Sequence, residues 1–188
     1  MSDFTPCGSF TPSSFASSTL ILPVVSLGNV PQLTADLLIF SLGLKRVGFV
    51  GKGDTVTPFA GKGEKNGDIV TGGLEVYGQE GSQLLSQPAA SGRSISSSYP
   101  PFLPAAGLTR RLLTALSEEK APIPHGAIAA WCVEGDNRGD ARSLAGVVLD
   151  VLSLQDVVQV QEPVSWEGLF GTTEGWSGGL GADAELYG

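Results

Sequence analysis

The chain has 188 residues and a formal net charge of -8 at pH 7, which argues against a nucleic-acid-binding surface because neutralising phosphates requires clustered Lys and Arg. The same acidity disfavours binding to anionic membrane surfaces. Only 16% of residues are charged, whereas Gly contributes 26 and Pro 12, so much of the chain is expected in turns, loops or a tail around one domain.

The first half of the chain predicts a strand, a helix and a second strand. Residues 1–18 are rich in Ser, Thr and Pro and are expected to be irregular, and the apolar run 20–26 predicts a buried strand. Asn29 can cap the helix that follows, and Gly43 can end it. The apolar stripe of this helix consists of Leu33, Leu37, Leu38 and Leu42. With a further strand over 46–51, this order is typical of a parallel sheet.

The middle of the chain has less pattern. Residues 51–68 are rich in Gly, Lys and Asp and predict a loop, and 74–77 predict a third strand. Residues 79–104 contain Gly, Ser, Gln, Ala and Pro with scattered leucines, and neither a helical nor a strand period is visible. Such a span is uncommon inside a compact domain, so we expect a loop at the site of a missing helix and strand.

The second half returns to regular patterns. A short helix is expected from Thr109 to Leu116, a strand over 128–133, a polar turn over 134–137, and a longer helix beginning at Asp140. The predicted apolar face of this last helix consists of Leu144, Val147, Val148, Val151 and Leu152. We therefore predict one α/β domain over 19–160, with a C-terminal tail over 161–188.

Motifs that suggest enzyme chemistry lack their context. The sequence Gly175-Trp176-Ser177-Gly178-Gly179 fits GxSxG, but a nucleophile elbow needs a strand, a helix and a histidine base, and His125 is the single histidine. The lysines of Gly51-Lys52-Gly53 and Gly61-Lys62-Gly63 are not followed by the Ser or Thr of a phosphate loop. No catalytic residue, cofactor or enzyme activity is predicted.

Metal and redox sites have equally little support. Glu134, Asp136 and Asp140 precede or begin a helix, where acidic groups oppose the positive end of the dipole, and they fall short of a calcium loop. Cys7 and Cys132 lack metal-ligand spacing, and two isolated cysteines suggest a reducing compartment. The Arg138-Gly139-Asp140 tripeptide is treated as chance. No secretory signal or membrane helix is visible, so a soluble intracellular protein is expected.

Four segments, taken in order, resemble the proteasome assembly chaperone 2 family. They are residues 22–30 with Gln32-Leu33 and Asp36-Leu37, then Glu75-Val76-Tyr77, then 133–137 with Asp140-Ala141, and finally Ser165-Trp166 with Leu169-Phe170-Gly171. The resemblance implies an α/β fold with a central, mostly parallel sheet flanked by helices on both faces and a flexible C-terminal tail. It also implies a non-catalytic chaperone of the cytoplasm and nucleus. Such a chaperone pairs with proteasome assembly chaperone 1 and binds the proteasome α-ring to promote 20S assembly.

The tail offers a mechanism for α-ring binding. Leu186-Tyr187-Gly188 fits the hydrophobic–tyrosine–any (HbYX) pattern of proteasome activators, whose tails enter pockets between α-subunits. The terminal carboxylate can pair with a pocket lysine, since capture of such a group is a recurring recognition mode. Trp166, Leu169 and Phe170 form an apolar cluster that we expect to anchor the tail. The exposed side of the 29–42 helix is a candidate partner face.

The chain departs from the family over 79–104, where family members carry a long helix and a further strand. We interpret this as an internal deletion, which would leave sheet edges and helix faces uncovered. Two alternatives stay open. One is an α/β enzyme of a nucleoside-binding type with an unrecognised site, and the other is a truncated product without a function of its own.

Overall fold

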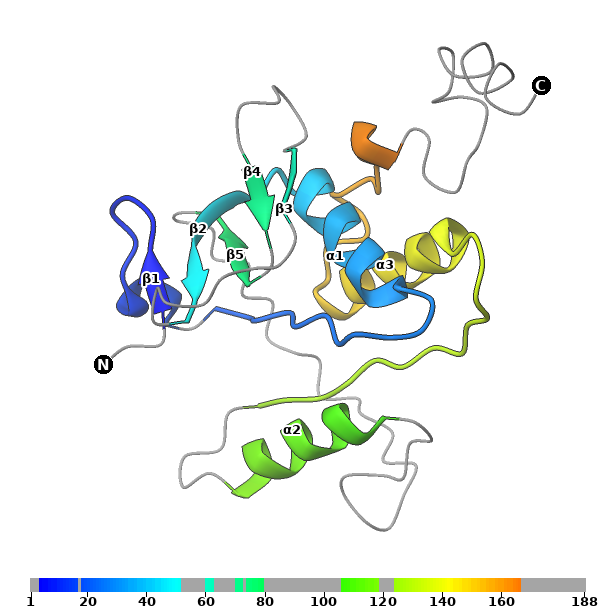
Figure 1. The fold of residues 1–188 in the computed structure, drawn as a ribbon, viewed down its shortest axis with the longest axis horizontal. Helices are drawn as coiled ribbons and strands as arrows, with labels where there is room; N and C mark the ends of the chain where they lie inside the picture. Colours follow the sequence, from blue (N-terminus) through cyan, green and yellow to red (C-terminus); the bar gives the residue numbers. More distant parts are fainter. Residues whose placement is uncertain are drawn as a thin grey trace, which may run out of the picture.

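The computed structural model describes residues 4–16, 18–51, 60–62, 70–72, 74–79, 106–118 and 124–166 (Figure 1). Its helices are α1 (Val30–Ser41), α2 (Gly107–Glu118) and α3 (Arg138–Val151), with the short 3-10 helices η1 (Pro12–Phe15) and η2 (Val164–Trp166). Its strands are β1 (Phe4–Pro6), β2 (Lys45–Val50), β3 (Ala60–Lys62), β4 (Val70–Gly72) and β5 (Glu75–Gly78). The predicted loop over 79–104 lies outside these residues apart from Gln79.

The sheet is antiparallel, so the predicted mostly parallel sheet is wrong. The strands lie in the order β1-β2-β5, and both pairs run antiparallel, as does the separate β3-β4 pair. The strand predicted over 20–26 was expected to share a parallel sheet with β2, but β2 instead pairs with β1 on one edge and β5 on the other. β1 falls within 1–18, where the sequence predicts no regular element.

Gly48 makes the pairing of β1 with β2 possible. A Cβ atom at this position would come within 2.3 Å of the Phe4 ring and 2.7 Å of the Thr5 carbonyl oxygen. The register of β2 on β5 also shifts between Arg46 and Gly48, which marks an irregularity of the bulge type. A glycine inside β2 therefore serves the close approach of a neighbouring strand.

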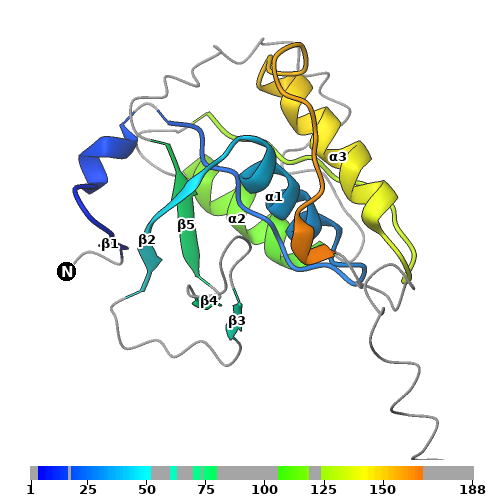
Figure 2. The ribbon, with the colours of Figure 1, turned by 90° about the horizontal axis from the view of Figure 1, so that it is seen from above.

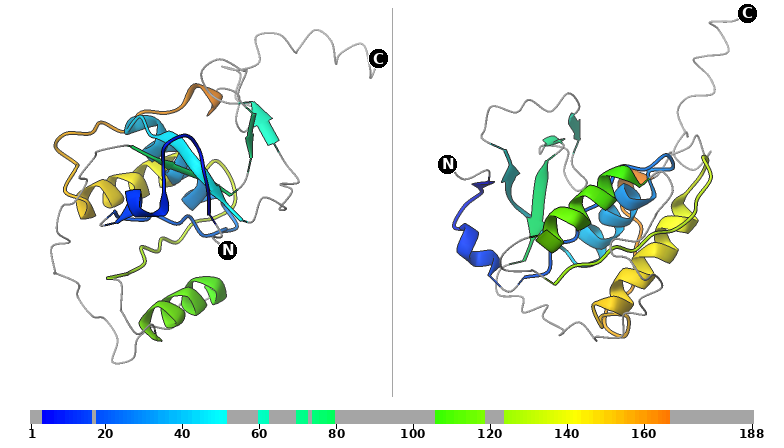
Figure 3. Two further views of the ribbon diagram at one scale, coloured as in Figure 1. Left: turned by 90° about the vertical axis from the view of Figure 1, so that its left-hand side faces the viewer. Right: turned by 90° about the horizontal axis from the view of Figure 1, so that it is seen from below.

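Two segments that were predicted to be strands do not form strands in the structure. Residues 20–26 and 128–133 run as extended chain, and neither belongs to a sheet among the described residues. Both segments lead in the same direction into α1 and α3, and they pass between the α1–α3 pair and α2 (Figures 1 and 3). The helices thus lie on two sides of extended chain that is not hydrogen-bonded into a sheet. This is the physical difference from the expected fold, because a parallel ladder needs a neighbouring strand.

Helix α1 begins and ends with residues in the left-handed region. Asn29 has φ 53° and makes no side-chain capping bond, so the predicted side-chain cap is wrong, although its carbonyl accepts from Leu33 N at 3.0 Å. At the other end Gly43 has φ 62°, and Leu44 N donates to Ile39 O at 2.9 Å. This is the Schellman arrangement, and it confirms that Gly43 ends the helix.

The core lies between α1 and α3, which pack side by side (Figure 2). As predicted, α1 contributes Leu33, Leu37 and Leu38. The predicted face of α3 is confirmed in part, because Val148 is buried and Leu152 packs on the core, whereas Val147 and Val151 are about half-exposed. The buried positions of α3 are Ala141, Ala145, Val148 and Leu149. The prediction relied on large apolar side chains and so left out the two alanines. Small side chains at a helix contact allow the two helices to approach closely.

Candidate binding surface and tail anchor

Most of the predicted tail residues lie outside the described part of the chain. This applies to Leu169, Phe170 and the terminal Leu186-Tyr187-Gly188. Trp166, the first residue of the predicted anchor, is described and lies in η2. The segment that leads to Trp166 therefore fixes the point from which residue 167 continues.

A return segment over 152–166 packs against α1 and α3. Gln161 N donates to Ser41 Oγ at 2.9 Å, which ties the segment to the end of α1. Glu162 forms an ion pair with Arg142 of α3. Four partly buried apolar side chains of the segment also pack on the helical core, namely Leu152, Leu154, Val158 and Val160. The segment is thus fixed to both helices by polar and apolar contacts.

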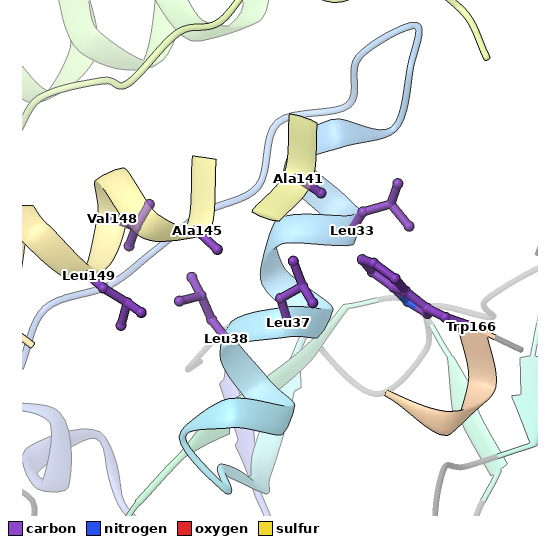
Figure 4. Packing of buried hydrophobic residues seen from close by; sticks show 8 residues of the cluster. All are labelled: Leu33, Leu37, Leu38, Ala141, Ala145, Val148, Leu149 and Trp166. Atoms are coloured by element: carbon purple, nitrogen blue, oxygen red, sulfur yellow. The ribbon is translucent and has the colours of Figure 1, made fainter. Parts of the chain in front are cut away.

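Trp166 ends the return segment inside the core. Its side chain lies beside Leu33 and Leu37 and is 2% exposed (Figure 4). Its indole Nε1 is buried and makes no hydrogen bond to any described residue. The contribution of Trp166 is therefore mainly apolar packing, and residues after 166 start from a point fixed beside α1.

A buried asparagine joins the extended segments at their helix ends. Asn137 Nδ2 donates to the carbonyl oxygens of Gly28 and Gly135, both at 3.1 Å, and Asn137 is 2% exposed. A Cβ atom on Gly28 would lie 2.6 Å from this nitrogen and 3.2 Å from Cys132 Sγ. The turn before α1 and the turn before α3 are therefore locked together.

The carboxylates around this turn have structural partners. Asp136 accepts hydrogen bonds from Arg138, with Nε to Oδ1 at 2.9 Å and Nη2 to Oδ2 at 2.7 Å. These side-chain bonds, and a weaker one from Arg138 N, lower the pKa of Asp136. Among the described residues no group of three His, Cys, Asp or Glu side chains could hold a metal ion. Glu134 and Asp140 do not join Asp136 in such a group.

A second polar network lies on β5, in the Glu75-Val76-Tyr77 segment. Glu75 accepts from Arg46 Nη1 at 3.1 Å and from the Tyr77 hydroxyl at 2.6 Å. Burial, then the hydrogen bond to Glu75, raises the pKa of Tyr77 well above its usual range. Arg46 also lies over the Phe49 ring, 5.2 Å from its centroid. The network joins β5 to β2. Sequence reasoning missed it, although the alternation of Glu75 and Tyr77 puts both on one face.

The candidate partner face on α1 is small. Asp36 is the one exposed residue of the helix, and the remaining residues are buried or half-buried. Larger exposed apolar surface lies instead on the extended segments. Trp131 is 86% exposed and Val133 80%, and Leu20, Val25 and Leu27 are also largely exposed. An exposed tryptophan among aliphatic residues is typical of a protein interaction site.

Features that an enzyme would need are weak in the described residues. A hollow beside α2 is lined by Gly107, Arg110, Arg111, Thr114, Ala115 and Glu118, all from one helix. His125 lies outside it, and no nucleophile–base pair lines it. No helix of the described residues has the length and apolar character to cross a membrane.

Comparison with known proteins gives a partial match. The chain is 34% identical to proteasome assembly chaperone 2 of Homo sapiens over 87 residues, which is 44% of this chain and 32% of the human protein. It is 50% identical to proteasome assembly chaperone 2 of Danio rerio over 58 residues, or 31% of this chain and 22% of that protein. The match thus spans about a third of the length of these relatives or less. It confirms the resemblance drawn from the four segments. No family model and no solved structure matches the chain.

Proposed function

We propose that this chain is a non-enzymatic subunit that pairs with proteasome assembly chaperone 1 and binds the proteasome α-ring to promote 20S assembly. The observation that carries the proposal is the partial identity to proteasome assembly chaperone 2 of several vertebrates. The name of those relatives states an assembly role and a chaperone class. Partner and α-ring binding by this chain are our extension of that role.

In this proposal the folded body and the tail have separate tasks. The body docks on the outer face of the α-ring, and Leu186-Tyr187-Gly188 enter a pocket between neighbouring α-subunits. Leu186 would bury apolar surface, and Tyr187 would pack and donate a hydrogen bond. The fixed position of Trp166 beside α1 supports this division, because it gives the tail a defined origin on the body. Leu169 and Phe170 would extend the anchor.

The spacing between anchor and motif suits a tethered contact. The chain from 167 to 188 has 22 residues, and at about 3.5 Å per residue it reaches at most about 75 Å. A tethered motif binds at an effective concentration set by this length, so a weak contact of three residues gains affinity from docking of the body. The net charge of -8 is compatible with a pocket lined by lysine.

The test measures binding of the purified chain to α-subunits. Tyr187→Ala, or removal of residues 186–188, should reduce the amount of bound α-subunit at least tenfold and leave the far-UV circular dichroism unchanged. Leu180→Ala is the matched control, since it removes an apolar side chain from the same tail outside the motif. Equal binding by Tyr187→Ala and Leu180→Ala would refute the tail mechanism. Loss of binding to proteasome assembly chaperone 1 in either variant would show that the tail acts elsewhere.

A further inference from the structure

Helix α3 carries two neighbouring apolar rows, and α1 covers one of them. The covered row faces the leucines of α1 and consists of Ala141, Ala145, Val148 and Leu149 (Figure 4). The second, which we call the outer row, consists of Leu144, Val147 and Val151, at i, i+3 and i+7 positions that share one side of a helix. Val147 is 47% exposed and Val151 54%, and Leu144 is half-buried. The apolar arc of α3 is therefore wider than its packing on α1 uses.

The outer row lies on an accessible side of the molecule. α1 lies between the sheet and α3, so α3 forms the outer layer of the helical pair (Figures 2 and 3). The return segment reaches α3 from another side, because Glu162 pairs with Arg142, which lies about half a turn from Leu144 around the helix. The exposure of Val147 and Val151 thus leaves room for a further element beside this row.

The charge around the outer row is negative. Asp140 lies one turn before Leu144, and Asp150 lies one turn after Val147. Both carboxylates are exposed, and neither forms an ion pair with a described residue. The two arginines of α3 already pair with carboxylates outside the helix, and residues 136–162 contain five acidic residues against these two arginines. A cationic partner is therefore attracted, whereas an acidic one, such as α3 of a second copy, is repelled.

The shape of the outer row favours a helix as its occupant. The backbone of α3 is hydrogen-bonded within the helix, so it offers no strand edge to an extended chain. Side chains three and four apart form a ridge of about 10 Å over 144–151, which fits the groove of a second helix. We propose that the outer row binds an amphipathic helix of another protein in which Lys or Arg flank apolar residues. Its apolar side chains pack on Val147 and Val151, and its cations face Asp150.

Fluorescence anisotropy of a synthetic helix, titrated with the full chain, tests the proposal. The probe is a labelled peptide of about 18 residues with Leu at i, i+3, i+4 and i+7 and Lys elsewhere, and a matched peptide carries Glu in place of Lys. We expect saturable binding of the Lys peptide, at least tenfold tighter than that of the Glu peptide. The double substitution Val147→Ala, Val151→Ala should weaken binding about fivefold, because it removes apolar contact and keeps a strong helix former. Asp150→Asn should weaken binding about threefold and reduce its dependence on salt.

Matched controls lie on other elements. Val50 of β2 is 49% exposed, close to the value for Val147, and Glu118 of α2 is an exposed carboxylate. Val50→Ala and Glu118→Gln should leave peptide binding unchanged, and far-UV circular dichroism of each variant checks the fold. Trp131→Ala tests the most exposed apolar side chain on the extended segments as a competing site.

Three results would overturn the proposal. They are the absence of saturable binding, equal affinity for the Lys and Glu peptides, and a loss of binding that follows Trp131→Ala or a control substitution rather than the α3 substitutions. The assay contains neither α-subunits nor the partner chaperone, and Tyr187→Ala should not change it. Failure of the α-ring proposal and failure of this one are therefore distinguishable.

Discussion

The α1–α3 pair and the two extended segments that lead into it differ in where their backbone hydrogen bonds and packing partners come from. Each helix satisfies its own backbone hydrogen bonds, and the pair then needs only apolar side chains, which it finds in one another and in Trp166. The extended segments need neighbouring strands, and none is present among the described residues. The two helices therefore find their packing partners within the described residues, whereas the extended segments find no strand partner there.

Two tryptophans give the largest expected contrast between these regions. Trp166 is 2% exposed in the helical core and Trp131 is 86% exposed on the extended segment. Trp166→Ala should lower the free energy of unfolding by about 3–5 kcal/mol, because it removes a buried aromatic side chain and leaves a cavity. Trp131→Ala should change it by less than about 0.5 kcal/mol. Urea unfolding of both variants measures the difference, and equal losses would contradict the two-region description.

Substitutions of two glycines, one in β2 and one in α3, are expected to change the stability by smaller amounts and in opposite directions. Gly48→Ala should destabilise the β1–β2 contact by about 1–3 kcal/mol, because the new methyl group would meet the Phe4 ring and the Thr5 carbonyl. Gly146→Ala in α3 meets nothing within 4 Å and should stabilise the helix by about 0.5–1 kcal/mol. Thermal melting should shift in opposite directions for the two variants. A shift in the same direction would show that one of these sites is packed differently.

The junction between the regions is held by Asn137. Asn137→Ala removes its donor bonds to Gly28 and Gly135 and leaves the buried Gly28 carbonyl with one partner fewer. The expected loss is about 1–3 kcal/mol, as for other buried hydrogen bonds that are broken from one side. Hydrogen exchange should also become faster at the starts of α1 and α3. Unchanged exchange at α1 would mean that the two turns are not coupled.

The smallest expected effect is the pH dependence of the Asp136–Arg138 pair. The folded pKa of Asp136 is lowered, so its contribution to stability is present above its unfolded value of about 4 and is lost as the pH falls through the folded value. Arg138→Gln should flatten the stability profile over this acid range, and Asp136→Asn should flatten it equally. The double variant should add nothing further. Additive effects would show that the two residues act separately.

The sequence predicted the helices well because their signals are local. The residues that predict α1 lie in the helix itself or directly after it. They are the stripe of Leu33, Leu37 and Leu38 and the terminating Gly43. The strands over 20–26 and 128–133 were recognised by apolar composition, but composition does not supply a pairing partner. β1 was missed because the three residues Phe4–Pro6 carry little strand signal and end in a proline. The need for a glycine at position 48 becomes visible only when Phe4 is seen to pack against it.

The candidate site shows the same difference between features with a local sequence signal and features that depend on distant contacts. Trp166 was singled out by its apolar neighbours, and its burial against α1 depends on contacts with residues more than a hundred positions earlier. The HbYX pattern and the tail residues Leu169 and Phe170 rest on sequence alone and remain predictions. The exposure of Trp131 was not predicted, since the sequence indicated only a strand over 128–133 and said nothing of which side chains it would bury.

The long interval between α1 and α3 has a consequence for synthesis on the ribosome. About 100 residues separate the end of α1 from the start of α3, and Trp166 follows later still. At about 5–20 residues per second, the leucine stripe of α1 emerges about 5–20 s before its covering helix has been translated. The nascent chain therefore carries Leu33, Leu37 and Leu38 uncovered through this interval. General chaperones that bind short apolar stretches are expected to act first at α1.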